Sequence, residues 1–102
     1  AGDIHSWVAV QEAQVVGFCN VQDRSGEVLV LAVQAGFEGH GLGRALLDCA
    51  VQHLHAVAGC ERIWLMAGAD PALRSHGFYR AQGWRPSGRC DQHGDEELVW
   101  QV

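Results

Sequence analysis

Four glycines lie close together in the first half of the chain, after an apolar run and before a helical pattern. The apolar run is residues 28–33, and the glycines are Gly36, Gly39, Gly41 and Gly43. A short, valine-rich run of this kind predicts a strand that is buried on both faces. Glycines let a backbone approach a ligand closely, and the first turn of a helix presents N–H groups that have no partner within the helix. This strand, turn and helix could therefore bind a phosphate group.

Two common phosphate-binding motifs do not fit this turn. The chain has no Gly-Lys-Ser/Thr segment, which excludes a P-loop. The glycines do not follow the Gly-x-Gly-x-x-Gly spacing, and the strands before them read as a meander, which excludes a Rossmann site. A tight turn that merely needs glycine stays open as the alternative to a phosphate site.

Composition narrows the class of protein. A chain of 102 residues with 48% hydrophobic and 19% charged residues predicts one globular domain over residues 1–102. The formal net charge of -5 argues against nucleic acid as a partner, because such a protein needs a basic face. The sequence has no apolar run of membrane-spanning length and does not open on a signal-peptide pattern. We expect a soluble, cytoplasmic protein that does not bind membranes.

The cysteines and histidines do not show the spacing of a metal site. No two cysteines form a Cys-x-x-Cys pair, so reduced, buried thiols are expected rather than a structural zinc site. His53 and His55 are two residues apart on a predicted helix and do not share a face. His5 and His93 are expected at a terminus and in a turn, without partners. The sequence therefore predicts no metal site. The four cysteines are Cys19, Cys49, Cys60 and Cys90.

Apolar patterning and turn residues predict six strands and two helices in the order β-β-β-α-β-α-β-β. The first three strands form an antiparallel meander, with a hairpin turn at residues 23–26. The fourth strand follows a helical crossover and should run parallel to the third. The fold class is thus α+β, with a mixed, mostly antiparallel sheet flanked by two helices. The expected strands are residues 5–10, 15–21, 27–34, 62–67, 84–89 and 97–102.

Both helices have recognisable ends. The first begins near Gly41, and Gly59 just past its end predicts a left-handed cap. The second begins with Asp70 as N-cap and Pro71 in the first helical position, and it runs to about Gln82. The apolar stripe expected on the first helix comprises Leu42, Ala45, Leu46, Cys49, Ala50, Leu54 and Val57.

Two motifs in this order resemble the GNAT superfamily of acyl-CoA-dependent N-acetyltransferases. The family's central motif is a buried strand, then Gln/Arg-x-x-Gly-x-Gly/Ala, then a helix. Residues 38–43 read Glu-Gly-His-Gly-Leu-Gly after such a strand. A second family motif is Phe/Leu-Tyr-x-x-x-Gly-Phe, and residues 78–84 read Phe-Tyr-Arg-Ala-Gln-Gly-Trp. The resemblance covers residues 5–102, nearly the whole chain.

The resemblance implies a site for acetyl-CoA, the acyl donor. In the family the pyrophosphate lies on backbone amides of the glycine turn, and the pantetheine arm pairs with the central strand. The amide of Leu31 would polarise the thioester carbonyl, as an oxyanion donor does. The strand positions that match are Leu31, Ala32 and Val33, and the turn positions are Glu38, Gly39, His40, Gly41, Leu42, Gly43 and Arg44.

The resemblance also implies two catalytic groups and an amine acceptor. Glu27 would be the general base that takes a proton from a primary amine before direct attack in a ternary complex. It lies about 20 Å of extended strand before the turn. Tyr79 would be the general acid that protonates the CoA thiolate. The alternatives are a solvated turn residue for Glu27 and a tyrosine that merely packs on the sheet.

Three departures from the family pattern keep a second interpretation open. Glu38 replaces the usual Gln or Arg, and Ala72 stands where many members have asparagine. Few residues precede the first predicted strand, where the family usually has a strand and one or two helices. The acceptor cleft would then be open, completed by a second copy in a homodimer, or completed by a missing segment. The alternative is a non-catalytic CoA-binding or protein-interaction module, and the acceptor, a small-molecule or peptide amine, is not defined by the sequence.

Overall fold

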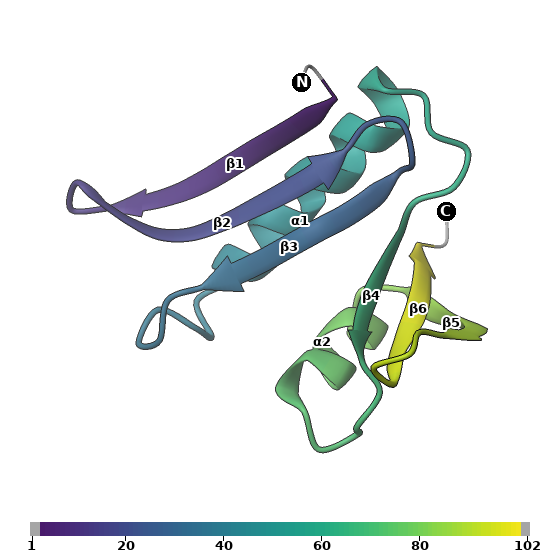
Figure 1. Ribbon diagram of the computed structural model, residues 1–102. Helices are drawn as coiled ribbons and strands as arrows, with labels where there is room; N and C mark the ends of the chain where they lie inside the picture. The colour runs from purple at the N-terminus through teal and green to yellow at the C-terminus, as the bar shows by residue number, and fades with distance from the viewer. Residues whose placement is uncertain (1–2, 101–102) are drawn as a thin grey trace. The chain divides into compact units, whose positions relative to one another are not determined.

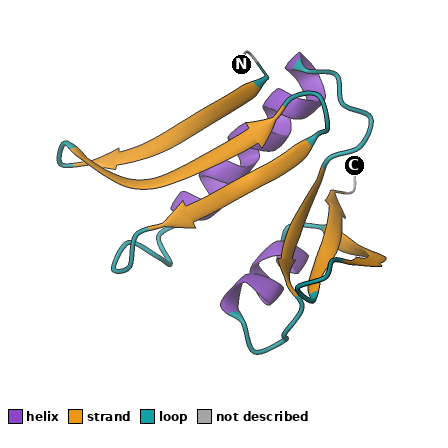
Figure 2. Cartoon of the chain, in the orientation of Figure 1, coloured by secondary structure: helices purple, strands orange, loops and turns teal. Residues whose placement is uncertain are grey.

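The structure is a computed structural model that describes residues 3–100. It contains six strands and two helices in the predicted order, which confirms the α+β class (Figures 1 and 2). The chain divides into two compact units, Ala1–Ile63 and Trp64–Val102, and each is described by itself. The grouping of both units into one domain stays a prediction.

The first unit is an antiparallel meander with one helix. Strands β1 (Ile4–Gln11), β2 (Gln14–Gln22) and β3 (Glu27–Val33) pair in sequence order. Helix α1 (Leu42–Gln52) runs along one face of these strands and continues into a π-helical turn, η1 (His53–Val57) (Figure 1). Residues 34–41, the glycine loop, join the end of β3 to the beginning of α1. The β2–β3 hairpin turn lies at the opposite end of β3.

The core of the first unit lies between α1 and the strands. Cys19, Val21, Leu47 and Leu54 are each at most 1% exposed. A Cβ atom added at Gly17 on β2 would lie 3.2 Å from the side chain of Leu46. The helix therefore packs closely against the middle strand, and this glycine leaves room for it.

The buried side of α1 differs from the predicted stripe. Leu47 and Val51 are buried, whereas Ala45 and Cys49 are exposed and Val57 is 74% exposed. Apolar residues lie on more than one side of this helix. The stripe predicted from three- and four-residue spacing is therefore rotated about the helix axis relative to the side that is buried. The π-helical turn after Gln52 changes the rotation per residue and moves the last predicted position away from the core.

The cysteines are free thiols, as expected, but their burial is uneven. Cys19 is buried and Cys60 half-buried, whereas Cys49 and Cys90 are exposed. Burial raises the pKa of the Cys19 thiol to about 11, and the nearby Cys49 adds to this shift. The expectation of four buried thiols is wrong for the two exposed ones.

Strand β3 is less covered than the sequence predicts. Val28 is buried, but Leu29 and Val30 are 40% and 42% exposed, so the strand is not buried on both faces. The β2–β3 ladder pairs Asn20 with Val30 and Val21 with Val28, which leaves Leu29 as an extra residue in β3. Such a β-bulge bends a strand and redirects its side chains. The strand also ends at Val33, one residue before the predicted end.

The second unit comprises β4 (Trp64–Gly68), helix α2 (Arg74–Ala81), β5 (Trp84–Cys90) and β6 (Asp95–Trp100). Strand β6 pairs antiparallel with both β4 and β5. Its buried carboxylates have partners, since Arg80 donates to Glu96 (2.5 Å) and the Ser87 hydroxyl donates to Glu97 (2.7 Å). The last two residues of the predicted final strand, 101 and 102, lie outside the described residues.

Helix α2 begins later than predicted. Its N-cap is Leu73 rather than Asp70. The Asp70 side chain instead accepts a hydrogen bond from the Ala72 N–H (2.9 Å), and the Asp70 carbonyl accepts one from the Leu73 N–H (3.0 Å). Asp70 and Pro71 thus form a turn before the helix, which is the other arrangement that these residue types favour. Within the described residues, no helix is long and apolar enough to span a membrane.

The hairpin turn between β2 and β3 depends on Gly26. This residue has a φ of 76°, and a Cβ atom there would lie 2.1 Å from the carbonyl oxygen of Arg62. We expect Gly26→Ala to lower the free energy of unfolding by about 3 kcal/mol, from positive-φ strain and from the displacement of packed backbone. Urea unfolding followed by circular dichroism measures this loss.

Gly59→Ala is the matched control in the same unit. Gly59 has a φ of 69°, but nothing lies within 4 Å of its added Cβ. This variant should lose only about 1 kcal/mol, the strain alone. Equal losses in the two variants would contradict the close packing of Gly26 against the backbone of Arg62.

Candidate functional site

The glycine loop adopts the conformation that only glycines adopt easily. Gly36, Gly39 and Gly41 have φ values of 95°, 81° and 82°. Gly41 is the N-cap of α1, in the left-handed conformation, and no atom lies within 4 Å of a Cβ added there. The sequence prediction that the helix begins at this glycine is therefore confirmed. The positive φ explains why glycine is needed at this position.

The beginning of α1 can accept an anion. The first hydrogen bond of the helix runs from the Ala45 N–H to the Gly41 carbonyl (3.0 Å). The N–H groups of Leu42, Gly43 and Arg44 lie before this bond, so they have no partner within the helix. Across the described residues, no side chain caps this helix and no acidic residue lies in its first turn. The helix dipole contributes about half a positive charge here. These features fit a pyrophosphate bound by backbone amides.

The side chains of the loop lie in solvent. Glu38, His40 and Arg44 are exposed. Arg44 adds a positive charge within the first turn of α1, whereas Glu38 adds a carboxylate three residues before the N-cap.

The hydrogen-bond pattern of the sheet determines which backbone groups of β3 face β2. The Gln34 N–H donates to a carbonyl of β2 at 2.7 Å, and bonded and non-bonded pairs alternate from there. Ala32 consequently exchanges its hydrogen bonds with Phe18. The N–H and C=O groups of Leu31 and Val33 point away from β2. Of the three predicted pantetheine contacts, Leu31 and Val33 therefore have the backbone orientation that pairing with a ligand requires.

The bulge at Leu29 is a feature that the sequence did not reveal. It lies between Glu27 and Leu31, the two β3 positions to which a chemical role was assigned. Two consecutive residues of β3 there, Leu29 and Val30, are exposed. A bulge next to a binding strand is common because it re-aims side chains. An uninterrupted run of apolar residues offers no signal for one.

Glu27 is the first residue of β3. Its N–H donates to the Ser25 hydroxyl (3.3 Å), and its side chain is half-buried. Burial raises the pKa of the Glu27 carboxyl above its ordinary value of 4.5. A carboxylate of raised pKa is a stronger base than an exposed glutamate, which is what a general base requires.

Tyr79 belongs to the second unit and lies on α2. Its half-buried ring makes edge contacts with Phe78 (centroids 5.2 Å apart) and with Trp84 (6.2 Å), the latter 1% exposed. Gly83 just after the helix has a φ of 96°, so it ends α2 as a left-handed residue. The motif over residues 78–84 thus packs the tyrosine ring and turns the chain into β5.

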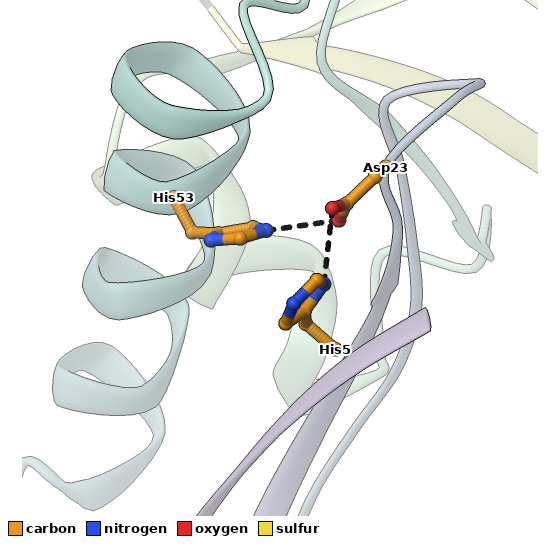
Figure 3. Close-up of side chains that lie close together, drawn as sticks. All are labelled: His5, Asp23 and His53. Atoms are coloured by element: carbon orange, nitrogen blue, oxygen red, sulfur yellow. Dashed lines mark hydrogen bonds and ion pairs between the residues drawn. The ribbon is translucent and has the colours of Figure 1, made fainter. Parts of the chain in front are cut away.

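A second cluster of polar side chains, missed by the sequence analysis, lies at the other end of β3. His5 on β1 and His53 on η1 both contact the carboxylate of Asp23 (Figure 3). His5 therefore has a partner, contrary to prediction, and His53 joins His5 rather than His55. Burial pushes the pKa of the Asp23 carboxyl upward, but the hydrogen bonds and charges of His53 and His5 outweigh it and hold the pKa below its ordinary value of 3.8.

The sequence also matches known proteins. Residues 1–84 match the acetyltransferase (GNAT) family. Mycothiol acetyltransferase of Beutenbergia cavernae is 39% identical over 70 residues, which are 69% of this chain and 23% of that protein. Mycothiol acetyltransferase of Streptomyces avermitilis is 35% identical over 68 residues, which are 63% of this chain and 22% of that protein.

Two solved structures share the fold. The PaiA N-acetyltransferase of Thermoplasma acidophilum, in complex with coenzyme A, has a TM-score of 0.83 and 18% identity over 98% of this chain and 62% of that one. Nourseothricin acetyltransferase has a TM-score of 0.78 and 25% identity over 95% of this chain and 63% of that one. The chain spans less than a quarter of the two mycothiol acetyltransferases that it matches. With residues 1–84 matched, the chain belongs to the acetyltransferase (GNAT) family.

Proposed function

We propose that the protein transfers the acetyl group of acetyl-CoA to a primary amine, by direct attack of the amine on the thioester in a ternary complex. The observation that carries the proposal is the left-handed Gly41 at the beginning of α1, which leaves three helix amides for a pyrophosphate. Membership of the acetyltransferase family supports the choice of acetyl-CoA as the anion. A cytoplasmic location and a homodimer that completes the acceptor site are parts of the same proposal.

The thioester arm would lie along the edge of β3 that faces away from β2. The N–H and C=O groups of Leu31 and Val33 point to that edge, and the pantetheine amides can pair with them as a neighbouring strand would. Ala32 would contribute its side chain alone, because its backbone pairs with Phe18. This arrangement directs the acyl group toward the bulge and toward Glu27 at the start of the strand.

The reaction needs one proton to leave the amine before its attack, a second to leave the nitrogen after it, and one to reach the leaving thiolate. Glu27 takes a proton from the ammonium form of the acceptor, and the free amine nitrogen attacks the carbonyl carbon of the thioester. The Leu31 N–H stabilises the negative charge on the carbonyl oxygen. The carbon–sulfur bond then breaks, and Tyr79 donates its phenolic proton to the leaving thiolate. The nitrogen, which carries one proton too many after its attack, releases it to water, and water returns a proton to the Tyr79 phenolate. The products are an N-acetylated amine and free CoA.

The acceptor is to be found by screening. The matched proteins are named for different compounds, mycothiol and nourseothricin, and the chain spans only part of each. The screen should therefore include a mycothiol-type amine, an aminoglycoside, a polyamine and peptides with a free N-terminus or lysine. Free CoA should be measured by chromatography, because the exposed Cys49 and Cys90 would react with a thiol reagent.

Release of CoA that depends on an amine would support the proposed acetyltransferase activity. Binding of acetyl-CoA without amine-dependent release, across the whole screen, would favour the non-catalytic CoA-binding module instead. Absence of both binding and release would overturn the proposal for this chain. Calorimetric titration with acetyl-CoA separates the last two outcomes.

The base is tested by Glu27→Gln. The raised pKa of Glu27 predicts an acidic limb in the pH profile of kcat/KM that lies above pH 4.5. We expect the pH profile of the variant to lack this limb. We also expect its kcat to be about 100-fold lower, because the general base has been removed. Steady-state kinetics over a pH range measures both effects.

Stability provides the control for this variant. Burial raises the folded-state pKa of Glu27, so its ionisation costs stability as the pH rises past the ordinary value of 4.5. Glutamine resembles the protonated form, and the variant should be at least as stable as the parent chain at pH 7. Glu12→Gln, at an exposed turn, should change neither property. Loss of activity together with loss of stability would point to a structural role.

A further inference from the structure

Three metal-ligating side chains from separate elements meet at the end of the first unit opposite the glycine loop. His5 Nδ1 lies 3.0 Å from one oxygen of Asp23, and His53 Nε2 lies 2.9 Å from the other (Figure 3). One ligand atom from each residue can be chosen so that all three lie within 4.8 Å of one another. We propose that His5, Asp23 and His53 bind a divalent transition-metal ion, Zn²⁺ in the first instance.

The donor set matches this class of ion. Two imidazole nitrogens and one carboxylate oxygen are common zinc ligands, with bonds of about 2.0–2.2 Å. Donors around a tetrahedral ion with such bonds lie about 3.4 Å apart. The two nitrogen–oxygen distances, 3.0 and 2.9 Å, run to different oxygens of Asp23, and one atom chosen from each residue lies within 4.8 Å of the other two. A small rotation of the side chains would thus admit the ion, whereas Mg²⁺ and Ca²⁺ prefer sets made of oxygen alone.

The backbone around the cluster holds the ligands in place before any ion binds. Antiparallel pairing of β1 and β2 sets His5 beside the end of β2, and the Asp23 N–H donates to the Asp3 carbonyl (2.7 Å). The Cys60 thiol donates to the Asp23 carbonyl (3.0 Å). The π-helical turn presents His53, and such turns often occur at functional sites. The ligands therefore do not need to be assembled from mobile segments.

Access and surroundings also suit a bound ion. The His53 side chain is 12% exposed and contacts the Trp7 ring edge-on, with centroids 5.3 Å apart. The His5 side chain is 47% exposed, which gives an ion and a fourth ligand such as water a path from solvent. The site thus has one shielded ligand, held by packing, and one open side.

The position of the cluster indicates its role. It joins β1, the β2–β3 turn and the junction between α1 and η1, and it lies at the other end of β3 from the loop proposed for pyrophosphate. A bound ion would cross-link these three elements, so its expected effect is on the stability of the first unit. This inference concerns residues that the proposed acetyl transfer does not use, and either proposal can fail without the other.

The test is titration of the full chain with Zn²⁺ by calorimetry and with Co²⁺ by visible absorption. We expect one ion per chain, a melting temperature that rises with Zn²⁺, and Co²⁺ bands without the thiolate charge-transfer absorption that a cysteine ligand would add. His53→Gln and His5→Gln should each weaken binding at least about 100-fold, since each removes one of three ligands. His5 is exposed, so its variant should fold even if His53→Gln does not.

His55→Gln is the matched control, because His55 lies on the same π-helical turn outside the cluster. It should leave the affinity unchanged. The proposal is overturned if the parent chain binds no ion, if His5→Gln binds as tightly as the parent chain, or if the Co²⁺ spectrum reports thiolate ligands. Equal losses in His5→Gln and His55→Gln would also overturn it, because they would indicate general surface binding.

Discussion

Gly41→Glu should weaken the binding of CoA at least about 100-fold. The new carboxylate would lie beside the amides of Leu42 and Gly43, where the pyrophosphate is proposed to bind. Two unit charges 4 Å apart repel by about 4 kcal/mol at an effective dielectric constant of 20, which exceeds the 2.7 kcal/mol or so that a 100-fold loss requires. Isothermal titration calorimetry of both proteins with CoA measures the change.

Two controls separate charge from backbone strain. Gly41→Gln adds a side chain of the same size without the charge, and it should lose much less affinity. Gly59→Glu adds a carboxylate at another left-handed glycine, with φ 69° and open space, at the far end of the α1–η1 helix. It should bind CoA as the parent chain does. Unchanged affinity in Gly41→Glu would place the nucleotide elsewhere.

Tyr79→Phe should lower kcat about 100-fold while KM for acetyl-CoA stays within about threefold. The phenylalanine ring keeps the contacts with Phe78 and Trp84, so the fold of α2 and β5 should be preserved. The variant removes the phenolic hydroxyl, the proposed proton donor for the CoA thiolate, and general acids contribute about 10²–10⁴-fold to rates. Steady-state kinetics with the best acceptor from the screen measures both parameters.

The pH profile distinguishes an acid from a packing residue. If Tyr79 donates the proton, the parent enzyme should lose kcat on the basic side of its profile, and the variant should lack that limb. A kcat within threefold of the parent value would show that Tyr79 only packs against its aromatic neighbours. An acyl acceptor whose product leaves slowly would hide the effect, so single-turnover measurement is the better form of the experiment.

Sequence patterns predicted the order of elements and the glycine turn well, because both depend on local physics. Gly41 adopts the positive φ that the start of the helix requires, and Gly26 adopts the positive φ that the hairpin turn requires. These requirements act within a few residues, so they can be recognised without the fold.

Other features depend on packing, and the sequence did not show them. The bulge at Leu29 and the π-helical turn after Gln52 change the register of side chains, and neither has a local signature. Asp70 favours both an N-cap and a simple turn, and in the structure its side chain accepts the Ala72 N–H within a turn. Residue types alone could not decide between these arrangements.

The cluster of His5, Asp23 and His53 shows the same limit for a candidate site. Its members are far apart in sequence, and they meet through the pairing of β1 with β2 and the contacts of His53 with Trp7 and Asp23. The strand ranges alone did not give that pairing register. The proposed roles of Glu27 and Leu31 came from the family resemblance, and the bulge at Leu29 between them was likewise invisible in the sequence.

The most direct test of the central claim is a titration of the ¹⁵N-labelled chain with CoA, followed by amide chemical shifts. We expect the largest shifts on Leu42, Gly43 and Arg44, with further shifts at Leu31 and Val33 and smaller ones at Ala32, whose amide pairs with β2. Gly41→Glu should abolish these shifts at the same CoA concentration. No shifts, or shifts confined to residues outside the glycine loop and β3, would contradict the proposal that this loop binds the cofactor.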